Sequence, residues 1–335
     1  MTTASKLMEE TIAAILDPGK GILAADESSK TIEKRFAGVS VPSTEETRRD
    51  YREMLFSTDG IENYISGVIL YEETLFQNAK KGGFLVELLK KKGIIPGIKV
   101  DKGTVPFSLR EGEVVTEGLD GLDDRIKTYK AAGARFAKWR AVITIGESIP
   151  TDDCIRANAK ALASYAMICQ KNEIVPIVEP EVLIDGDHTI ERSYEVTERT
   201  LGIVFDEMQI QGVSREHLLL KPSMVISGKT CPVKAPVEKV AEQTLRCLKS
   251  AVPGDVPGIA FLSGGQSDEE ATAHLNEMNK RGPHPWVLTF SYARALQNAA
   301  LKIWSGKESN VKDAQTAFLK RAKANSEAAK GIYST

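Results

Sequence analysis

The stretch VPIVEPEV, residues 175–182, is one of eight short apolar runs on which the fold depends. Gly and Pro residues separate these runs, and each run is followed by a segment with helical periodicity. Continuous apolar character, rather than strict alternation, is what strands buried on both faces require. The predicted strands cover residues 21–26, 66–71, 96–100, 136–142, 175–182, 218–225, 258–264 and 286–292.

The segments between the runs indicate helices. Ser43 with Glu46 predicts a capping box at the start of one helix, and Ser267 with Glu270 predicts another. Further helices are expected over residues 6–16, 122–132, 151–172, 189–212, 235–251, 293–304 and 311–330.

Eight strands that alternate with helices predict an α/β fold, a (β/α)8 TIM barrel with additional N- and C-terminal helices. We expect one domain over residues 1–335. The competing architecture is a doubly wound open sheet, but no G-x-G-x-x-G follows an early strand, so its dinucleotide-binding form lacks the fingerprint.

Composition limits the classes of function. Hydrophobic residues make up 42% and charged residues 27% of the 335, which suits a large core. The net charge of −2 argues against a nucleic-acid binder. Four cysteines without zinc-ligand spacing indicate neither a disulfide framework nor a zinc site. With no signal segment and no long apolar run, we expect a cytoplasmic protein that is not inserted in a membrane.

Charged residues interrupt several of the apolar runs, late in their predicted strands. Asp26 closes the first run, Lys138 and Arg140 lie two apart in the fourth, and Glu179 and Glu181 lie two apart in the fifth. Side chains alternate along a strand, so each spaced pair points to one side. If that side is the barrel interior, two cations face two anions. The pattern is compatible with a structural ion-pair network, but catalytic groups of barrels also lie at the carboxyl ends of strands.

Lys221 is the residue whose sequence context most strongly indicates a catalytic role. Three leucines precede it and Pro222 follows it, so its ammonium is expected to be desolvated, with Lys138 or Lys102 as a neighbouring cation. Desolvation favours the neutral amine, which can form a Schiff base with a ketone. Such a mechanism also needs proton shuttles, for which the candidates are Glu179, Glu181 and Asp26. The alternatives are a salt-bridged lysine and acids that serve only as counter-ions.

Two segments suggest phosphate binding. Ser263 and Gly264 end the seventh run in a small turn, and the eighth run ends in SYAR, residues 291–294, at the start of a helix. Loops after strands seven and eight form the recurrent phosphate site of this fold, and Arg294 can supply a bidentate contact. The loop after the first run offers a second basic site, although its charges are also typical of a solvated helix start; it contributes Ser28, Lys34 and Arg35. The four histidines show no metal-binding spacing and are interpreted as structural.

These residues resemble a known family. The segments GILAADES, GIKVDKG, GLDGL, FAKWR, VPIVEPE, LLLKPSMV, FLSGGQS and LTFSYARALQ, in this order, are similar to class I fructose-bisphosphate aldolase over nearly the whole chain. The resemblance implies a (β/α)8 barrel, commonly a homotetramer, that needs no metal or other cofactor. It also implies reversible cleavage of fructose 1,6-bisphosphate to dihydroxyacetone phosphate and glyceraldehyde 3-phosphate, in glycolysis, gluconeogenesis or carbon fixation.

The resemblance also implies roles for single residues. Lys221 would be the Schiff-base nucleophile, Glu179 the general acid and base, and Glu181 the residue that orients the lysines. The residues that stabilise charge and handle the substrate hydroxyls would be Lys138, Arg140 and Asp26, with Lys102 lining the same site. The phosphate of the ketone half would meet Ser263, Gly264, Ser291 and Arg294, and the other phosphate Ser28, Lys34 and Arg35.

Three departures from the family pattern carry expectations. Ala293 stands where the family often has Gly, and we expect a small effect. Ser29 and Lys30 replace Thr-Gly, which adds a charge near the second phosphate site. Family members usually continue for about twenty residues to a tyrosine that assists proton exchange at the enamine, whereas this sequence ends at Thr335. We expect slower release of the ketone phosphate or another proton carrier, which deuterium exchange into dihydroxyacetone phosphate would test.

Two other functions remain open. Another Schiff-base barrel, such as a transaldolase or a single-phosphate aldolase, would share the lysine, but two separate basic sites favour a bisphosphate. A non-catalytic scaffold or binding role would not require Lys221, Glu179 and Lys138 together.

Overall fold

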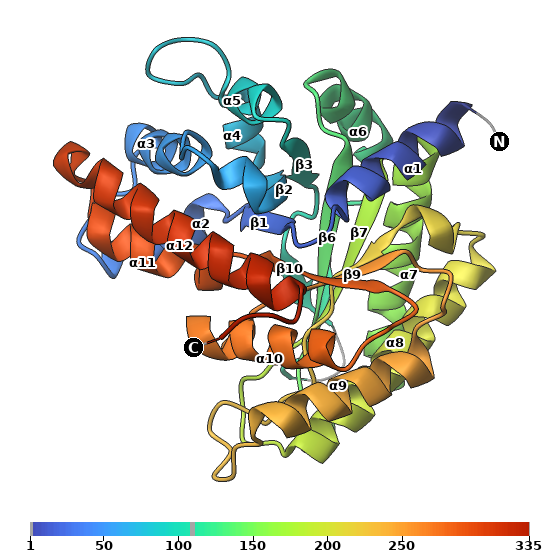
Figure 1. The fold of residues 1–335 in the computed structure, drawn as a ribbon. Coiled ribbons are helices and arrows are strands. Elements are labelled where there is room, and N and C mark those ends of the chain that lie inside the picture. The colour runs from blue at the N-terminus through green and yellow to red at the C-terminus, as the bar shows by residue number, and fades with distance from the viewer. Residues whose placement is uncertain (1–2, 108–110, 335) are drawn as a thin grey trace.

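The computed structural model describes residues 3–107 and 111–334, and its centre is a closed barrel of eight parallel strands (Figure 1). Around the barrel the strands follow the order β1-β10-β9-β8-β7-β6-β3-β2. Their bounds are Gly21–Ala25 for β1, Ile65–Leu70 for β2, Ile95–Lys99 for β3, Phe136–Ile143 for β6, Val175–Val182 for β7, Leu219–Leu220 for β8, Gly258–Phe261 for β9 and Val287–Tyr292 for β10. All eight predicted strands are thus confirmed, and the doubly wound sheet is excluded.

Strand β8 is much shorter than its predicted run of residues 218–225. Lys221 still donates its backbone N–H to the carbonyl of Val178 at 2.8 Å, but Pro222 has no N–H to continue the ladder. The strand therefore ends near Lys221, at the carboxyl end of the barrel, although the Pro222 carbonyl still accepts from the backbone N–H of Leu262 at 3.2 Å.

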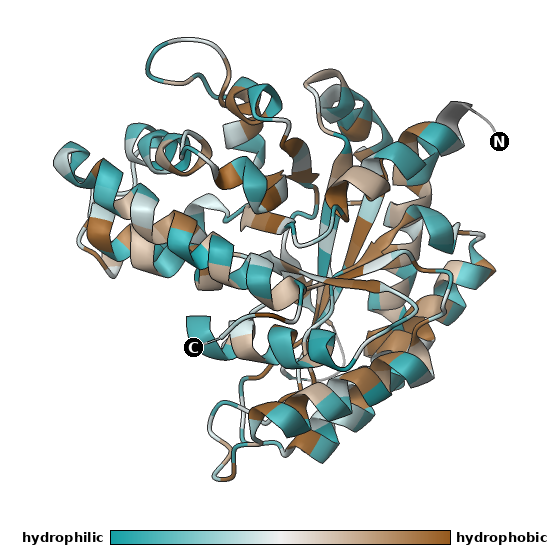
Figure 2. Cartoon of the chain, viewed as in Figure 1, coloured by the Kyte–Doolittle hydropathy of each residue, from teal (hydrophilic) through white to brown (hydrophobic). Residues whose placement is uncertain are grey.

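Helices surround the barrel and pack their apolar faces on the strands. Figure 2 shows mostly hydrophobic strands, with hydrophilic residues along the outer faces of the helices. The helices are α1 Thr3–Ile15, α2 Ser29–Ala37, α3 Glu45–Phe56, α4 Glu72–Phe76, α5 Leu85–Lys91, α6 Leu122–Ala131, α7 Asp152–Lys171, α8 Ile190–Ile210, α9 Val237–Ala251, α10 Asp268–Lys280, α11 Arg294–Trp304 and α12 Val311–Ala329. An antiparallel hairpin of β4 (Thr104–Pro106) and β5 (Val114–Thr116) follows β3.

The predicted helices are present, with one cap misplaced. Ser267 and Glu270 form the expected capping box of α10. The cap of α3 is Thr44 rather than Ser43, and its partner is Thr47 rather than Glu46. The Thr47 hydroxyl accepts from the backbone N–H of Thr44 at 2.9 Å, so the helix begins one residue later than predicted. Short helices α4 and α5 and the hairpin were not anticipated.

The amino end of the barrel is filled by apolar side chains. Met8, Ile12 and Ile15 of α1 form a buried cluster with inward-facing residues of the strands, among them Phe136. A Cβ on Gly97 would lie 2.2 Å from the Phe136 ring, so the glycine makes room for this large side chain. With one end sealed by apolar packing, the polar residues are confined to the opposite end. No helix in the described part of the chain is long and apolar enough to cross a membrane.

Candidate active site

A cavity of about 440 Å³ opens at the carboxyl ends of the strands. Four charged side chains form its floor, and each comes from a different strand or strand end: Asp26 after β1, Lys138 in β6, Glu179 in β7 and Lys221 after β8. Each of these residues is at least nine-tenths buried. Because these residues lie in or directly after parallel strands of one barrel, their side chains are held in a fixed arrangement.

The four side chains form one continuous chain of ion pairs. Lys138 Nζ lies 2.8 Å from Asp26 Oδ2 and 2.9 Å from Glu179 Oε2. The other oxygen of Glu179, Oε1, lies 3.0 Å from Lys221 Nζ. Glu179 therefore connects the two lysines, and Lys138 connects the two acids.

The groups in this series of ion pairs stabilise one another's charged forms. Burial opposes ionisation of Asp26, but Lys138 and Lys221 outweigh it and lower the pKa of Asp26 to about 2. Burial likewise opposes ionisation of Glu179, and the same two lysines, with Arg140, bring its pKa below the usual range. Burial would lower the pKa of Lys138, yet Asp26 and Glu179 raise it overall. Both acids are thus held as carboxylates, beside a charged Lys138.

Arg140 and Glu181 form the second cation–anion pair that the spacing predicted. The Nε of Arg140 donates to Glu181, and both residues line the cavity above the ion-pair chain. Gly264 packs against this pair, because a Cβ at that position would lie 2.8 Å from Glu181 Oε1. The loop after β9 is therefore in direct contact with the carboxylate beside Glu179.

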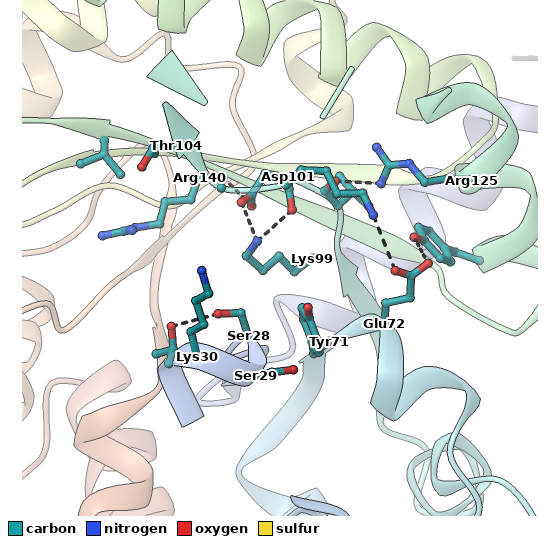
Figure 3. A pocket seen from close by; sticks show the side chains of 16 residues that line it. Ser28, Ser29, Lys30, Tyr71, Glu72, Lys99, Asp101, Thr104, Arg125 and Arg140 are labelled. Carbon is teal, nitrogen blue, oxygen red and sulfur yellow. Dashed lines mark hydrogen bonds and ion pairs between the residues drawn. The ribbon is translucent and has the colours of Figure 1, made fainter. Parts of the chain in front are cut away.

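Lys99 belongs to the site and was missed. Its ammonium lines the cavity and lies 2.5 Å from Asp101 Oδ1. Figure 3, which draws the adjoining cavity that Lys99 also lines, marks this contact with a dashed line. The available signal was a lysine inside the third apolar run. Lys102 is half exposed and pairs with Glu72 at 3.6 Å. It lines an adjoining cavity of about 620 Å³ that shares Ser28, Lys99 and Arg140 with the first, and its contact with the substrate stays a prediction.

All seven predicted phosphate-binding residues line this cavity. Ser263, Gly264, Ser291 and Arg294 come from the ends of β9 and β10, whereas Ser28, Lys34 and Arg35 follow the neighbouring strand β1. The side chains of Arg294 and Lys34 are exposed and have no hydrogen-bond or ion-pair partner within residues 3–107 and 111–334. Arg35 differs, because it pairs with Glu27 and donates to Gln297. Arg294 and Lys34 are thus the cations free to meet an anionic ligand.

The histidines lie outside the lining of this cavity. His274, for example, is buried against Gln266, and burial lowers its pKa to about 4. Across the described residues, no group of three or more His, Cys, Asp or Glu side chains could hold a metal ion.

The structure is a parallel barrel in which a buried lysine forms an ion pair with a carboxylate at the carboxyl ends of the strands. This is the architecture of an enzyme that acts through a lysine. Comparison with known proteins identifies the family. Residues 7–335 match the family model described as fructose-bisphosphate aldolase class-I. This chain belongs to the class I fructose-bisphosphate aldolases, a family that works through a Schiff base rather than a metal.

Individual relatives agree along nearly the whole length. A probable fructose-bisphosphate aldolase class 1 from Xanthomonas campestris is 56% identical over 97% of this chain and 98% of its own. Cytosolic fructose-bisphosphate aldolase 4 from Arabidopsis thaliana is 55% identical over 96% of this chain and 82% of its own. A solved structure of the Plasmodium falciparum aldolase superposes with a TM-score of 0.98 at 50% identity, covering 100% of this chain and 97% of that one.

Proposed function

We propose that this chain cleaves fructose 1,6-bisphosphate reversibly into dihydroxyacetone phosphate and glyceraldehyde 3-phosphate, through a Schiff base on Lys221. The observation that carries the proposal is the contact of 3.0 Å between Lys221 Nζ and Glu179 Oε1 in a buried site. It gives the amine a proton acceptor at hydrogen-bond distance, which is the first requirement of a nucleophilic lysine.

The first half-reaction forms the imine. Glu179 accepts a proton from the Lys221 ammonium, and the neutral amine attacks the C2 carbonyl to give a carbinolamine. The protonated Glu179 then donates to the departing hydroxyl, which leaves as water and creates a cationic iminium at Nζ. Lys138 stays charged throughout and stabilises Glu179 each time it returns to the carboxylate.

The second half-reaction breaks the carbon–carbon bond. Glu179 takes the proton of the C4 hydroxyl, the C3–C4 bond cleaves, and its electron pair moves toward the iminium to form an enamine. Glyceraldehyde 3-phosphate departs as the aldehyde. Protonation of the enamine at C3 and hydrolysis of the resulting iminium then release dihydroxyacetone phosphate and regenerate Lys221. Asp26 and Arg140 are placed to hold the substrate hydroxyls during these steps.

The two phosphates are proposed to lie at two separate places along the cavity wall. Ser263, Gly264, Ser291 and Arg294 receive the phosphate of the ketone half, and Ser28, Lys34 and Arg35 the other. Ser291 supports this assignment, because its hydroxyl is buried without a hydrogen-bond partner in the described residues. The unpaired state of Arg294 and Lys34 supports it as well, since an anion replaces no existing ion pair there.

The proposed setting follows the relatives. Two of the similar Arabidopsis proteins are named cytosolic, which supports a cytoplasmic enzyme of glycolysis, gluconeogenesis or carbon fixation. A homotetramer is proposed from the family resemblance, and size-exclusion chromatography with light scattering measures it.

The test is a coupled assay for bisphosphate cleavage, with and without a strong chelator. We expect full activity in chelator, loss of activity in Lys221→Met by at least about 10³-fold, and no loss in Lys320→Met, which changes an exposed lysine of α12. Cleavage by folded Lys221→Met at the wild-type rate would contradict the proposal. So would loss of wild-type activity in chelator.

A further inference from the structure

Gln297 is a fully buried polar side chain close to the cavity, and the proposed mechanism does not use it. It lies on α11, one turn after Arg294. Its Nε2 donates to the carbonyl of Ala24 at 2.7 Å. Its Oε1 accepts from Arg35 Nη1 and from the hydroxyl of Tyr51, both at 3.0 Å. A guanidinium can only donate and a carbonyl can only accept, so the partners themselves fix the orientation of the amide.

The partners of Gln297 belong to the elements that carry the two proposed phosphate sites. Ala24 is in β1, two residues before Asp26. Arg35 is in α2, beside Lys34, whereas Gln297 shares α11 with Arg294. One buried amide therefore connects the helix of the ketone-phosphate site to the strand and helix of the other phosphate site.

A second layer of charge holds the same region in place. Glu27 pairs with Arg35 and lies 3.9 Å from Nη2 of the fully buried Arg52, which also donates to the Glu27 carbonyl at 2.8 Å. Arg35 Nη1 thus donates to both Glu27 and Gln297. Since a buried polar group costs free energy unless it is bonded, an apolar residue at position 297 would leave the Ala24 carbonyl without this donor and the Tyr51 hydroxyl without this acceptor.

We propose that Gln297 is a positioning residue that sets the separation between the two phosphate-binding sides of the cavity. The proposal rests on the proposed function. It has a consequence that a purely structural role lacks: only a substrate with two phosphates spans both sides, so only such a substrate is sensitive to their separation. Fructose 1-phosphate meets one side alone and serves as the matched probe.

The experiment compares Gln297→Met, which keeps the volume and removes all three bonds, with the wild type. For each protein, kcat and KM are measured with fructose 1,6-bisphosphate and with fructose 1-phosphate. We expect kcat/KM to fall about tenfold more for the bisphosphate than for the monophosphate, mostly through KM. The control is Asn325→Leu, because Asn325 is equally buried and bonds to Thr272 and the Arg321 carbonyl, away from the cavity lining. Its substrate ratio should stay within about twofold of the wild type.

A second variant keeps the test decisive if Gln297→Met does not fold. Gln297→Glu retains the acceptor for Arg35 and Tyr51 but has no donor for the Ala24 carbonyl, so the substrate ratio should still fall. Equal losses for both substrates in either folded Gln297 variant, as in Asn325→Leu, would overturn the proposal. If the wild type itself does not cleave the bisphosphate, the proposed function fails instead, and the two failures are distinct.

Discussion

Replacing Lys138 by Met should destabilise the fold in a way that depends on pH. Lys138 Nζ contacts Asp26 at 2.8 Å and Glu179 at 2.9 Å. At an effective dielectric constant of about 20, each contact corresponds to an attraction of about 6 kcal/mol. Desolvation of the buried ions offsets much of this, and removal of one partner from a buried ion pair typically costs about 3–5 kcal/mol. We expect that loss at pH 8.

The stability of the variant depends on pH because Asp26 loses its ion-pair partner and Glu179 does not lose both of its partners. Glu179 keeps Lys221, whereas Lys138 is the ion-pair partner of Asp26 among the described residues. Burial raises the pKa of Asp26, and Lys138 is the first of the groups that lower it, ahead of Lys221 and Lys99, so the variant should have a higher Asp26 pKa than the wild type. The folded variant then takes up the Asp26 proton at a higher pH than the folded wild type, so its stability falls less as the pH drops. The deficit relative to the wild type should therefore shrink as the pH falls from 8 toward about 3.

The assay is denaturant unfolding of both proteins at several pH values between about 3 and 8. The double variant with Asp26→Asn removes the stranded carboxylate as well and should recover a large part of the stability at pH 8. A deficit that is constant over this pH range would refute the reasoning, as would one below about 1 kcal/mol at pH 8.

Three further predictions concern the rim and floor of the cavity. Arg294→Met should lower kcat/KM for the bisphosphate about 10- to 100-fold, mainly by raising KM, because it removes an unpaired cation; an unchanged KM would exclude Arg294 from phosphate binding. Gly264→Ala should reduce kcat, because the new Cβ would lie 2.8 Å from Glu181 Oε1 and displace it; wild-type kcat would show that Glu181 tolerates the shift. Asp26, with its pKa lowered from 3.8 to about 2, contributes about 2 kcal/mol of stability that is present above about pH 4 and lost as the pH falls toward 2. The stability difference between the wild type and Asp26→Asn should shrink over that window, and a constant difference would count against it.

The barrel was predictable because a parallel strand buried on both faces leaves a continuous apolar run, and eight such runs are visible. What the runs do not reveal is where hydrogen bonding stops. Pro222 ends β8 after two residues, although the apolar pattern continues to Val225. The predicted cap at Ser43 was wrong because the Thr47 hydroxyl accepts from the backbone N–H of Thr44, which makes Thr44 the capping residue.

The floor of the active site was predictable from period-two spacing, whereas the orientation of the Lys102 side chain was not. Lys138 and Arg140 do face Glu179 and Glu181 across adjacent strands. Lys102 lies beyond the end of β3, where strand alternation no longer decides which way a side chain points.

The network around Gln297 could not be predicted from the sequence. Gln297 and Arg35 are separated by 262 positions, and nothing local in either helix marks the contact. Only the closure of the barrel, which brings β10 next to β1, places α11 beside α2. Contacts of this kind depend on the whole fold rather than on a motif.

Reductive trapping measures the proposed Schiff base itself. Borohydride is added to the protein with dihydroxyacetone phosphate or the bisphosphate, and the labelled peptide is identified by mass spectrometry. We predict one stable adduct per chain, on Lys221, and none in Lys221→Met. An adduct on any other lysine, or no adduct from a protein that cleaves the bisphosphate, would contradict the mechanism.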